Sequence, residues 1–194
     1  MKKTTSKVLV TGVVRLSYAH LDEPYSHDSD RPAKYSTAIL IDKKDTAIIE
    51  NIKKACSELA KENADILGNT KNVRIPLRDG DAYFENMGEK YLPYKGNYFM
   101  NLSSKIKPAL YDKLNNKIEF TQDEFYSGCF ARVSMKLYTY NVSGNKGITA
   151  ELRAVQKIKD ADRLDGVNID TSNDFSAPAN EINTSDDTDM SIFD

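Results

Sequence analysis

Two stretches of the sequence combine basic and aromatic side chains in a way that suits unpaired nucleotides. In the first, basic and aromatic residues interleave: Arg74, Arg78, Tyr83, Phe84, Lys90, Tyr91, Tyr94, Lys95, Tyr98 and Phe99. In the second, alternate residues of 129–140 share one face of a predicted strand: Phe130, Arg132, Ser134, Lys136, Tyr138 and Tyr140. Cations neutralise phosphates, and flat rings stack on bases with little regard to sequence, at about 1–3 kcal/mol per base. The pattern favours binding of single-stranded nucleic acid, although a hydrated sheet face with some tyrosines would alternate in the same way.

Enzymatic chemistry finds less support in the sequence. Asp79 and Asp81 could hold Mg²⁺ in a nuclease, but Asp-Gly-Asp is also ordinary turn chemistry, which we favour. His20 and His27 flank a polar loop without a triad or metal partner nearby, and are expected at the surface. The sequence has no Walker loop, GxGxxG or HExxH motif. We therefore predict a protein with no catalytic residues, no metal and no cofactor.

The net charge of −2 conceals two oppositely charged blocks. Residues 164–194 hold eight of the 29 acidic residues and no Lys or Arg, so residues 1–163 keep 21 acidic against 27 basic residues, a balance of +6. Acidic, polar tails of this kind bury too little apolar surface to fold alone. We predict a binding domain over 1–163 and a disordered acidic tail over 164–194. The sequence has no stretch that could span a bilayer, so a cytoplasmic protein that does not bind membranes is expected.

The hydrophobic pattern predicts a mainly β fold. Residues 7–18 alternate as a strand with a bend at Gly12, and 34–42 form a second strand. Asp45 or Thr46 should cap a helix that runs to about Asn63. Residues 68–98 suggest loops and short strands, followed by a short strand, an Asn-Asn turn and another extended piece up to 120. Two long strands should meet in a hairpin around residues 144–147, and Cys56 and Cys129 should be buried free thiols. The expected architecture is an OB-like five-stranded barrel with an inserted α-helix.

The chain resembles the single-stranded-DNA-binding proteins of tailed bacteriophages that have an OB-fold and an acidic C-terminal tail. The resemblance is carried by "IPLRDGD" (75–81), "YKGNYFMNLSSKIKPALYD" (94–112), "YSGCFARVSMKLYTYN" (126–141) and "GNKGITAELRAVQKIKDADRLDG" (144–166). It implies a protein without catalytic activity that coats exposed DNA in phage replication, recombination or repair, in the host cytoplasm. One departure concerns the end of the tail, where Asp194 follows the aromatic Phe193.

The strand-face argument and these motifs together give the predicted DNA-binding residues. They are Arg15, Lys34, Tyr35, Arg78, Tyr91, Lys95, Tyr98, Lys105, Arg132, Lys136, Tyr138 and Lys146. The tail residues Asp186, Asp187, Asp189, Ile192, Phe193 and Asp194 are predicted to compete for the DNA groove and to recruit replication or recombination proteins. Homo-oligomerisation is compatible with this interpretation. The alternatives are a phage structural or inhibitory protein-binding module and, less favoured, the nuclease centred on Asp79 and Asp81.

Overall fold

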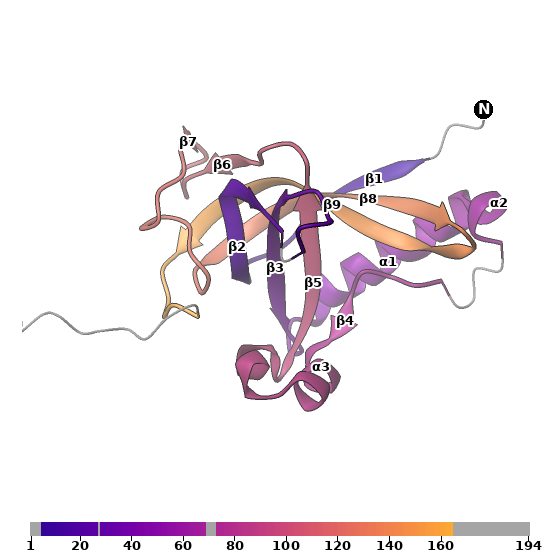
Figure 1. Cartoon of the computed structure of the whole chain (residues 1–194), viewed down its shortest axis with the longest axis horizontal. Coiled ribbons are helices and arrows are strands. Elements are labelled where there is room, and N and C mark those ends of the chain that lie inside the picture. The colour runs from indigo at the N-terminus through magenta and orange to yellow at the C-terminus, as the bar shows by residue number, and fades with distance from the viewer. Residues whose placement is uncertain (1–4, 27, 69–72, 165–194) are drawn as a thin grey trace, which may run out of the picture.

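Five strands close a ring in the computed structural model, which describes residues 5–26, 28–68 and 73–164. They are β2 (Val14–Tyr25), β3 (Lys34–Asp42), β5 (Asn97–Ser104), β9 (Asn145–Lys159) and β8 (Phe130–Val142). Each pairs with the next in that order, and β8 pairs back with β2 (Figure 1). Closure removes the free edges that an open sheet would expose. The predicted mainly β barrel with an inserted helix is confirmed.

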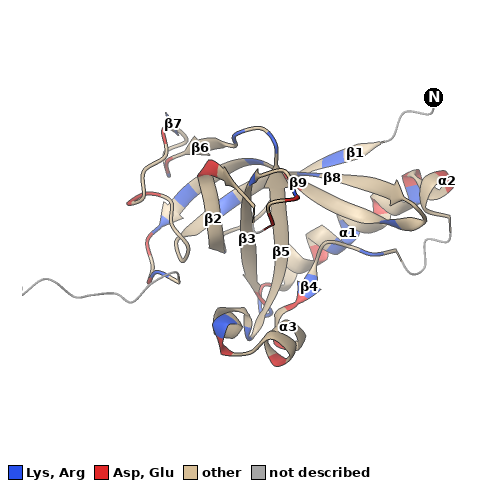
Figure 2. Cartoon of the chain, viewed as in Figure 1, with Lys and Arg blue, Asp and Glu red and all other residues tan. Residues whose placement is uncertain are grey.

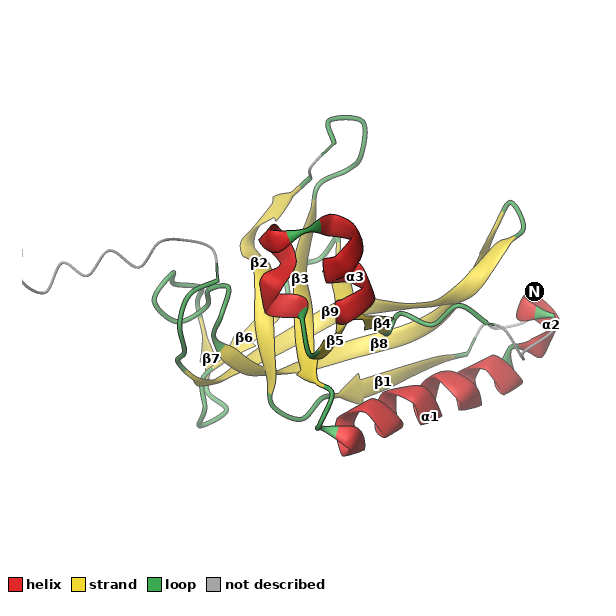
Figure 3. Cartoon of the chain, turned by 90° about the horizontal axis from the view of Figure 1, so that it is seen from below, coloured by secondary structure: helices red, strands yellow, loops and turns green. Residues whose placement is uncertain are grey.

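The remaining elements surround this ring. They are β1 (Ser6–Val10), α1 (Thr46–Glu62), α2 (Ala64–Leu67), β4 (Arg78–Asp79), α3 (Gly80–Met87), the 3-10 helix η2 (Glu89–Tyr94), β6 (Ala109–Tyr111) and β7 (Lys117–Ile118). β1 extends the sheet at β8, while β4 pairs with β5, and β6 with β7 lies beyond β9. Helix α1 lies on one side of the strands, and α3 with η2 lies on the other (Figure 3). The described residues include no helix long and apolar enough to cross a membrane.

The single strand predicted over residues 7–18 is two strands, and the break falls at the predicted bend. Thr11 is buried there, and its hydroxyl accepts a hydrogen bond from the Val133 amide at 3.0 Å. A Cβ on Gly12 would lie 2.7 Å from Cδ1 of Ile48, so the glycine lets α1 approach the chain. β2 then continues to Tyr25, into the segment predicted as a polar loop.

The barrel interior and α1 share one apolar core. Helix α1 begins after Asp45 as predicted and buries a stripe that includes Ile52, Cys56 and Leu59. The inward alternation predicted for 129–140 is confirmed, because Cys129, Ala131, Val133, Met135 and Leu137 are all fully buried. Both cysteines are free and buried, as predicted. Burial of these side chains drives closure of the ring at about 25 cal/mol per Å² of apolar surface.

The hairpin of β8 and β9 turns slightly earlier than predicted. Val142 pairs with Asn145, so Ser143 and Gly144 form a two-residue turn rather than the expected 144–147. Both have positive φ, 49° and 83°, as a type I′ turn requires. The turn twists in the same sense as the strands, which favours this long hairpin.

The prediction of loops and short strands for 68–98 was right only in part, since the short strand β4 lies there but residues 80–94 hold α3 and η2. These helices have 8 and 6 residues, too short for a clear helical period in the sequence. Asp79 caps α3, and its side chain accepts from the Asp81 amide at 2.9 Å. We call residues 80–94, which hold α3 and η2, the helical arm.

Gly128→Ala should destabilise the fold far more than Gly144→Ala. Both glycines have positive φ, 121° and 83°, so either alanine adds about 1–2 kcal/mol of backbone strain. A Cβ at Gly128 would also lie 2.1 Å from the carbonyl oxygen of Asp162, whereas nothing lies within 4 Å at Gly144. Urea unfolding should therefore show an additional loss of about 1–3 kcal/mol for Gly128→Ala. Equal losses would contradict the close packing of Asp162 and Arg163 on Gly128.

Candidate nucleic-acid interface

The outer face of β3 and β5 carries apolar residues that the barrel core does not cover. Ala38, Leu40 and Phe99 form a second buried cluster with Tyr94 of the helical arm, and Phe99 is only 1% exposed. The Phe99 ring lies 4.9 Å from the rings of both Tyr94 and Tyr83. The helical arm is thus held against the sheet by ring packing.

Two further tyrosines complete this cluster at the surface. The Tyr91 ring lies 4.9 Å from Tyr83, edge to face, and 6.4 Å from Tyr18 of β2. Tyr18 is placed by a β-bulge, because Ser17 pairs with Ala38 while His20 already pairs with Ser36. Its φ is 48°, a strained value for a tyrosine. Bulges redirect side chains, and this one places the Tyr18 ring beside the arm.

Between the arm and the sheet lies a hollow of about 410 Å³, which we call the aromatic chamber. It is lined by Tyr18, His20, Tyr25, Ser36, Thr37, Ala38, Tyr83, Lys90, Tyr91, Tyr94, Phe99, Asn101, Leu102 and Ser103. His20 and Tyr25 stack with their centroids 4.4 Å apart and their planes within 13°. Among the described residues of this lining Lys90 is the one cation, and its Nζ lies 5.9 Å from the Tyr91 ring centroid. The described lining combines flat rings, hydroxyls, an amide and a cation, which suits a nucleobase and its phosphate.

Three phenols of this chamber have a raised pKa and stay neutral at physiological pH. Burial raises the pKa of Tyr94 to about 12, and burial also raises the pKa of Tyr83. Burial and then the nearby Tyr91 raise the pKa of Tyr18. These three rings therefore carry no phenolate charge that would repel a phosphate backbone.

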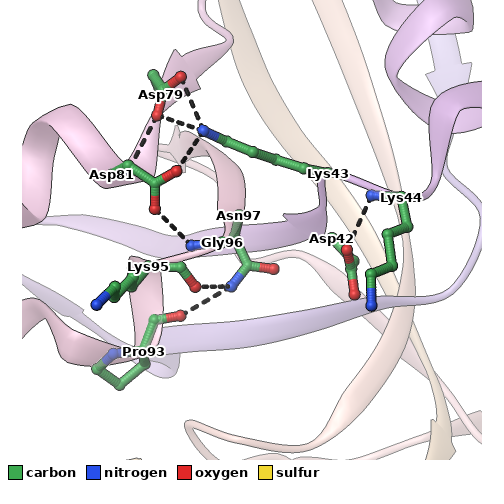
Figure 4. A network of polar contacts seen from close by, with 9 residues as sticks. All are labelled: Asp42, Lys43, Lys44, Asp79, Asp81, Pro93, Lys95, Gly96 and Asn97. Atoms are coloured by element: carbon green, nitrogen blue, oxygen red, sulfur yellow. Dashed lines mark hydrogen bonds and ion pairs between the residues drawn. The ribbon is translucent and has the colours of Figure 1, made fainter.

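One lysine anchors the helical arm at its base (Figure 4). Lys43 Nζ contacts Asp79 Oδ1 at 2.8 Å and Asp81 Oδ2 at 2.6 Å, and Asp81 Oδ1 accepts from the Gly96 amide at 2.6 Å. The hydrogen bond from Lys43 lowers the pKa of Asp79, whereas Asp81 has its pKa lowered first by the Gly96 amide and then by Lys43. Asp79 and Asp81, the two carboxylates considered above for a nuclease, therefore hold the end of β3 and the start of β5 against α3. In the described ranges no group of three or more His, Cys, Asp or Glu is placed to hold a metal ion.

A second hollow, of about 530 Å³, adjoins the chamber, and we call it the arginine groove. It is lined by Arg74, Ile75, Pro76, Arg78, Asn101, Tyr140, Ile148 and Thr149. Asn101 of β5 lines both hollows, so the two share a wall at that residue. Figure 2 shows basic segments at β4 and along β8 and β9.

The structure brings some of the predicted DNA-binding residues to this surface. Tyr91 lines the chamber and Arg78 lines the arginine groove. Lys34 lies at the chamber end of β3 and pairs with Tyr25. Tyr138 lies on the outer face of β8 and pairs with Thr149 of the arginine groove, whereas Lys136 lines a separate hollow with Val8, Ile106 and Glu151.

Other predicted residues lie away from both hollows. Tyr35 is on the opposite face of β3 from Lys34, Lys95 sits beside Phe84 at the end of the arm, and Lys105 follows β5. Arg132 lies near the other end of β8, and Lys146 is beside the hairpin turn. The predicted tail residues 186–194 fall outside the described residues.

Arg15 and Tyr98 have structural contacts instead. Arg15 donates to the carbonyl oxygens of Gly128 at 3.0 Å and Asp162 at 2.8 Å. Tyr98 packs against the main core, with Lys43 and Lys53 at 5.1 and 5.5 Å from its ring centroid. Lys53 belongs to α1, so Tyr98 faces the side opposite the chamber.

Several lining residues were not selected from the sequence. Tyr83, Tyr94 and Phe99 lay within the basic and aromatic stretch, but their convergence depends on an arm that the sequence pattern did not predict. Tyr18 and His20 were missed because the bulge that places them leaves no mark in the alternation. His20 was expected at the surface; it is half-buried and lines the chamber.

Sequence comparison matches residues 7–189 to the family described as Enterobacter phage Enc34, ssDNA-binding protein. Protein p50 of Acyrthosiphon pisum secondary endosymbiont phage 1 is 32% identical over 171 residues, 84% of this chain and 89% of that protein. The solved structure of the single-stranded DNA-binding protein from bacteriophage Enc34 in complex with ssDNA superposes with a TM-score of 0.67. It is 23% identical and covers 80% of this chain and 88% of that one.

A more distant structural match is gp2.5, a single-stranded DNA binding protein encoded by bacteriophage T7. Its TM-score is 0.56 at 16% identity, over 90% of this chain and 98% of that one. At these identities the solved structures show a shared fold, while the family assignment rests on the sequence matches. Because the family match spans far more than half of the sequence, the chain belongs to the family of the ssDNA-binding protein of Enterobacter phage Enc34.

Proposed function

We propose that this protein binds single-stranded DNA with little sequence preference through the aromatic chamber and the outer strand face beside it. The observation that carries the proposal is the convergence of Tyr18, Tyr83 and Tyr91 on one hollow. Every base has a π-face, so such rings accept any sequence. The family relationship supports DNA as the ligand, because the family is named for a ssDNA-binding protein.

The biological role follows from this binding. The protein coats exposed strands during phage replication, recombination or repair, in the cytoplasm of the host, and it does so without catalysis. Support comes from the phage origin of its relatives and from the engagement of Asp79 and Asp81 in the anchor of the arm.

The acidic tail competes with DNA for the same surface in this proposal. Leu164 is the last described residue, and it packs against the cluster of Ala38, Leu40, Tyr94 and Phe99. Its amide donates to the Ser127 carbonyl at 2.8 Å, which fixes its position. The chain therefore leaves the domain beside the aromatic chamber. Carboxylates of the tail mimic phosphates and Phe193 mimics a base, and both are released to replication or recombination proteins when DNA enters.

Tyr91→Ala should weaken DNA binding, whereas Tyr91→Phe should leave it nearly unchanged. Loss of the ring removes about 1–3 kcal/mol for each base that stacks on it, while phenylalanine keeps the π-face. The measurement is fluorescence anisotropy of a labelled oligo-dT, with thermal unfolding of each variant as a folding control. Tyr111→Ala, on β6 away from the chamber, should bind like the unaltered protein. An equal loss of affinity in the Tyr111 and Tyr91 alanine variants would contradict the assignment of the chamber.

Binding should also weaken as salt rises, with a log–log slope of about −0.7 for each phosphate neutralised. The basic balance of residues 1–163 motivates this expectation. The same titration at low and moderate salt measures the slope. A protein-binding module that does not use DNA would show no oligo-dT affinity at either concentration.

Removing residues 166–194 should tighten DNA binding, most strongly at low salt. The truncation deletes seven acidic residues and no Lys or Arg, so a competing polyanion is lost. The milder variant Phe193→Ala separates two mechanisms. If the tail acts by charge alone, which salt screens beyond about 8–10 Å, this variant should not change affinity. If the tail occupies the chamber, as proposed, Phe193→Ala should tighten binding slightly. Unchanged affinity in the truncated protein would overturn the competition.

A further inference from the structure

The arginine groove offers two guanidinium groups whose positions are set by strand pairing. The Arg74 carbonyl accepts from the Ile148 amide at 2.8 Å, and Arg74 forms a parallel bridge with Gly147 of β9. Arg78 pairs with Phe99 of β5 through β4. A Cβ at Gly147 would lie 2.9 Å from the Arg74 carbonyl, so glycine permits this approach. Both arginines are therefore presented by fixed backbone, although their side chains are exposed.

Neither guanidinium is neutralised within the part of the chain that the structure describes. Arg74 Nη1 donates to the amide oxygen of Asn145 at 3.4 Å, which is a neutral partner. No ion pair of either arginine occurs among the described residues. None of the described residues that line the groove is acidic. The groove thus keeps two positive charges available for an anion.

The groove also continues the path of the aromatic chamber. Asn101 lines both hollows, and Tyr140 places a ring in the groove. Arg78 lies next to the chamber, because it pairs with Phe99, which lines the chamber. A ligand that leaves the chamber past Asn101 meets cations and then an aromatic ring.

We infer that the arginine groove is a phosphodiester-binding subsite for the nucleotides that leave the aromatic chamber, with Arg74 and Arg78 on the phosphates and Tyr140 on a base. Guanidinium forks match phosphate oxygens with paired hydrogen bonds, which a lysine cannot reproduce. The inference rests on the proposed single-stranded-DNA binding. The inference also gives the bound DNA a direction: the DNA strand crosses β5 at Asn101 and runs toward the β8–β9 hairpin.

The test compares two oligonucleotide lengths in the full-length protein. An oligo-dT of about 4 nucleotides can fill the chamber alone, and one of about 16 nucleotides can reach the groove. The double variant Arg74→Gln/Arg78→Gln should bind the short oligonucleotide like the unaltered protein. For the long one it should lose about tenfold in affinity per arginine, and its salt slope should fall by about 1.4, or 0.7 for each phosphate contact.

Two further variants control for charge and folding. Lys113→Gln/Lys117→Gln removes the same charge from two exposed positions near β6 and β7. Because these lysines line neither hollow, this variant should keep its affinity for the long oligonucleotide within about threefold of the unaltered protein. Arg74→Lys/Arg78→Lys keeps the charge, so it should restore the salt slope but only part of the affinity. If Arg74→Gln/Arg78→Gln binds the long oligonucleotide as tightly as Lys113→Gln/Lys117→Gln does, the groove inference is overturned and the proposed function is not. Absence of any oligo-dT binding by the unaltered protein would overturn the proposed function with it.

Discussion

The packing of aromatic rings on the outer face of β3 and β5 is the interaction on which the proposed interface depends. A barrel needs to bury only its interior, yet Leu40 and Phe99 point outward and are apolar. Tyr94 of the helical arm covers them and is itself only 3% exposed. Rings that are partly buried in this way bring large apolar area and lose little conformational freedom on binding. The same packing that stabilises the arm therefore prepares the surface that we assign to DNA.

The position of the arm is set at its base and by its glycines. Lys43 joins Asp79 and Asp81 to the end of β3, and the Gly96 amide holds Asp81 from the other side. Gly80 lies so close to the Tyr94 carbonyl that a Cβ there would be 2.2 Å from the oxygen. These exposed ion pairs contribute modestly to stability on their own. Their importance is geometric, because they fix where the rings of the arm meet the sheet.

The sequence predicted the parts of this structure that depend on local periodicity. The alternation of β8, the bounds of β3 and the extent of α1 were all correct, because burial imposes a period of two or of 3.6 on the residues concerned. The arm was missed because its helices are too short to show a period, and Tyr18 because its orientation comes from a bulge. Arg15 and Tyr98 were selected by residue type, but the tertiary contacts of Gly128, Asp162 and Lys53 decide where their side chains lie.

We propose that single-stranded DNA lies in the aromatic chamber and along the strand face beside it. Ultraviolet cross-linking of oligo-dT to the protein, followed by mass spectrometry of the linked peptides, tests this placement most directly. We expect cross-links on the peptides that carry Tyr18, Tyr83, Tyr91 and Tyr140. Cross-links confined to the opposite side, on Tyr98 and α1, or to Tyr111 on β6, would contradict it.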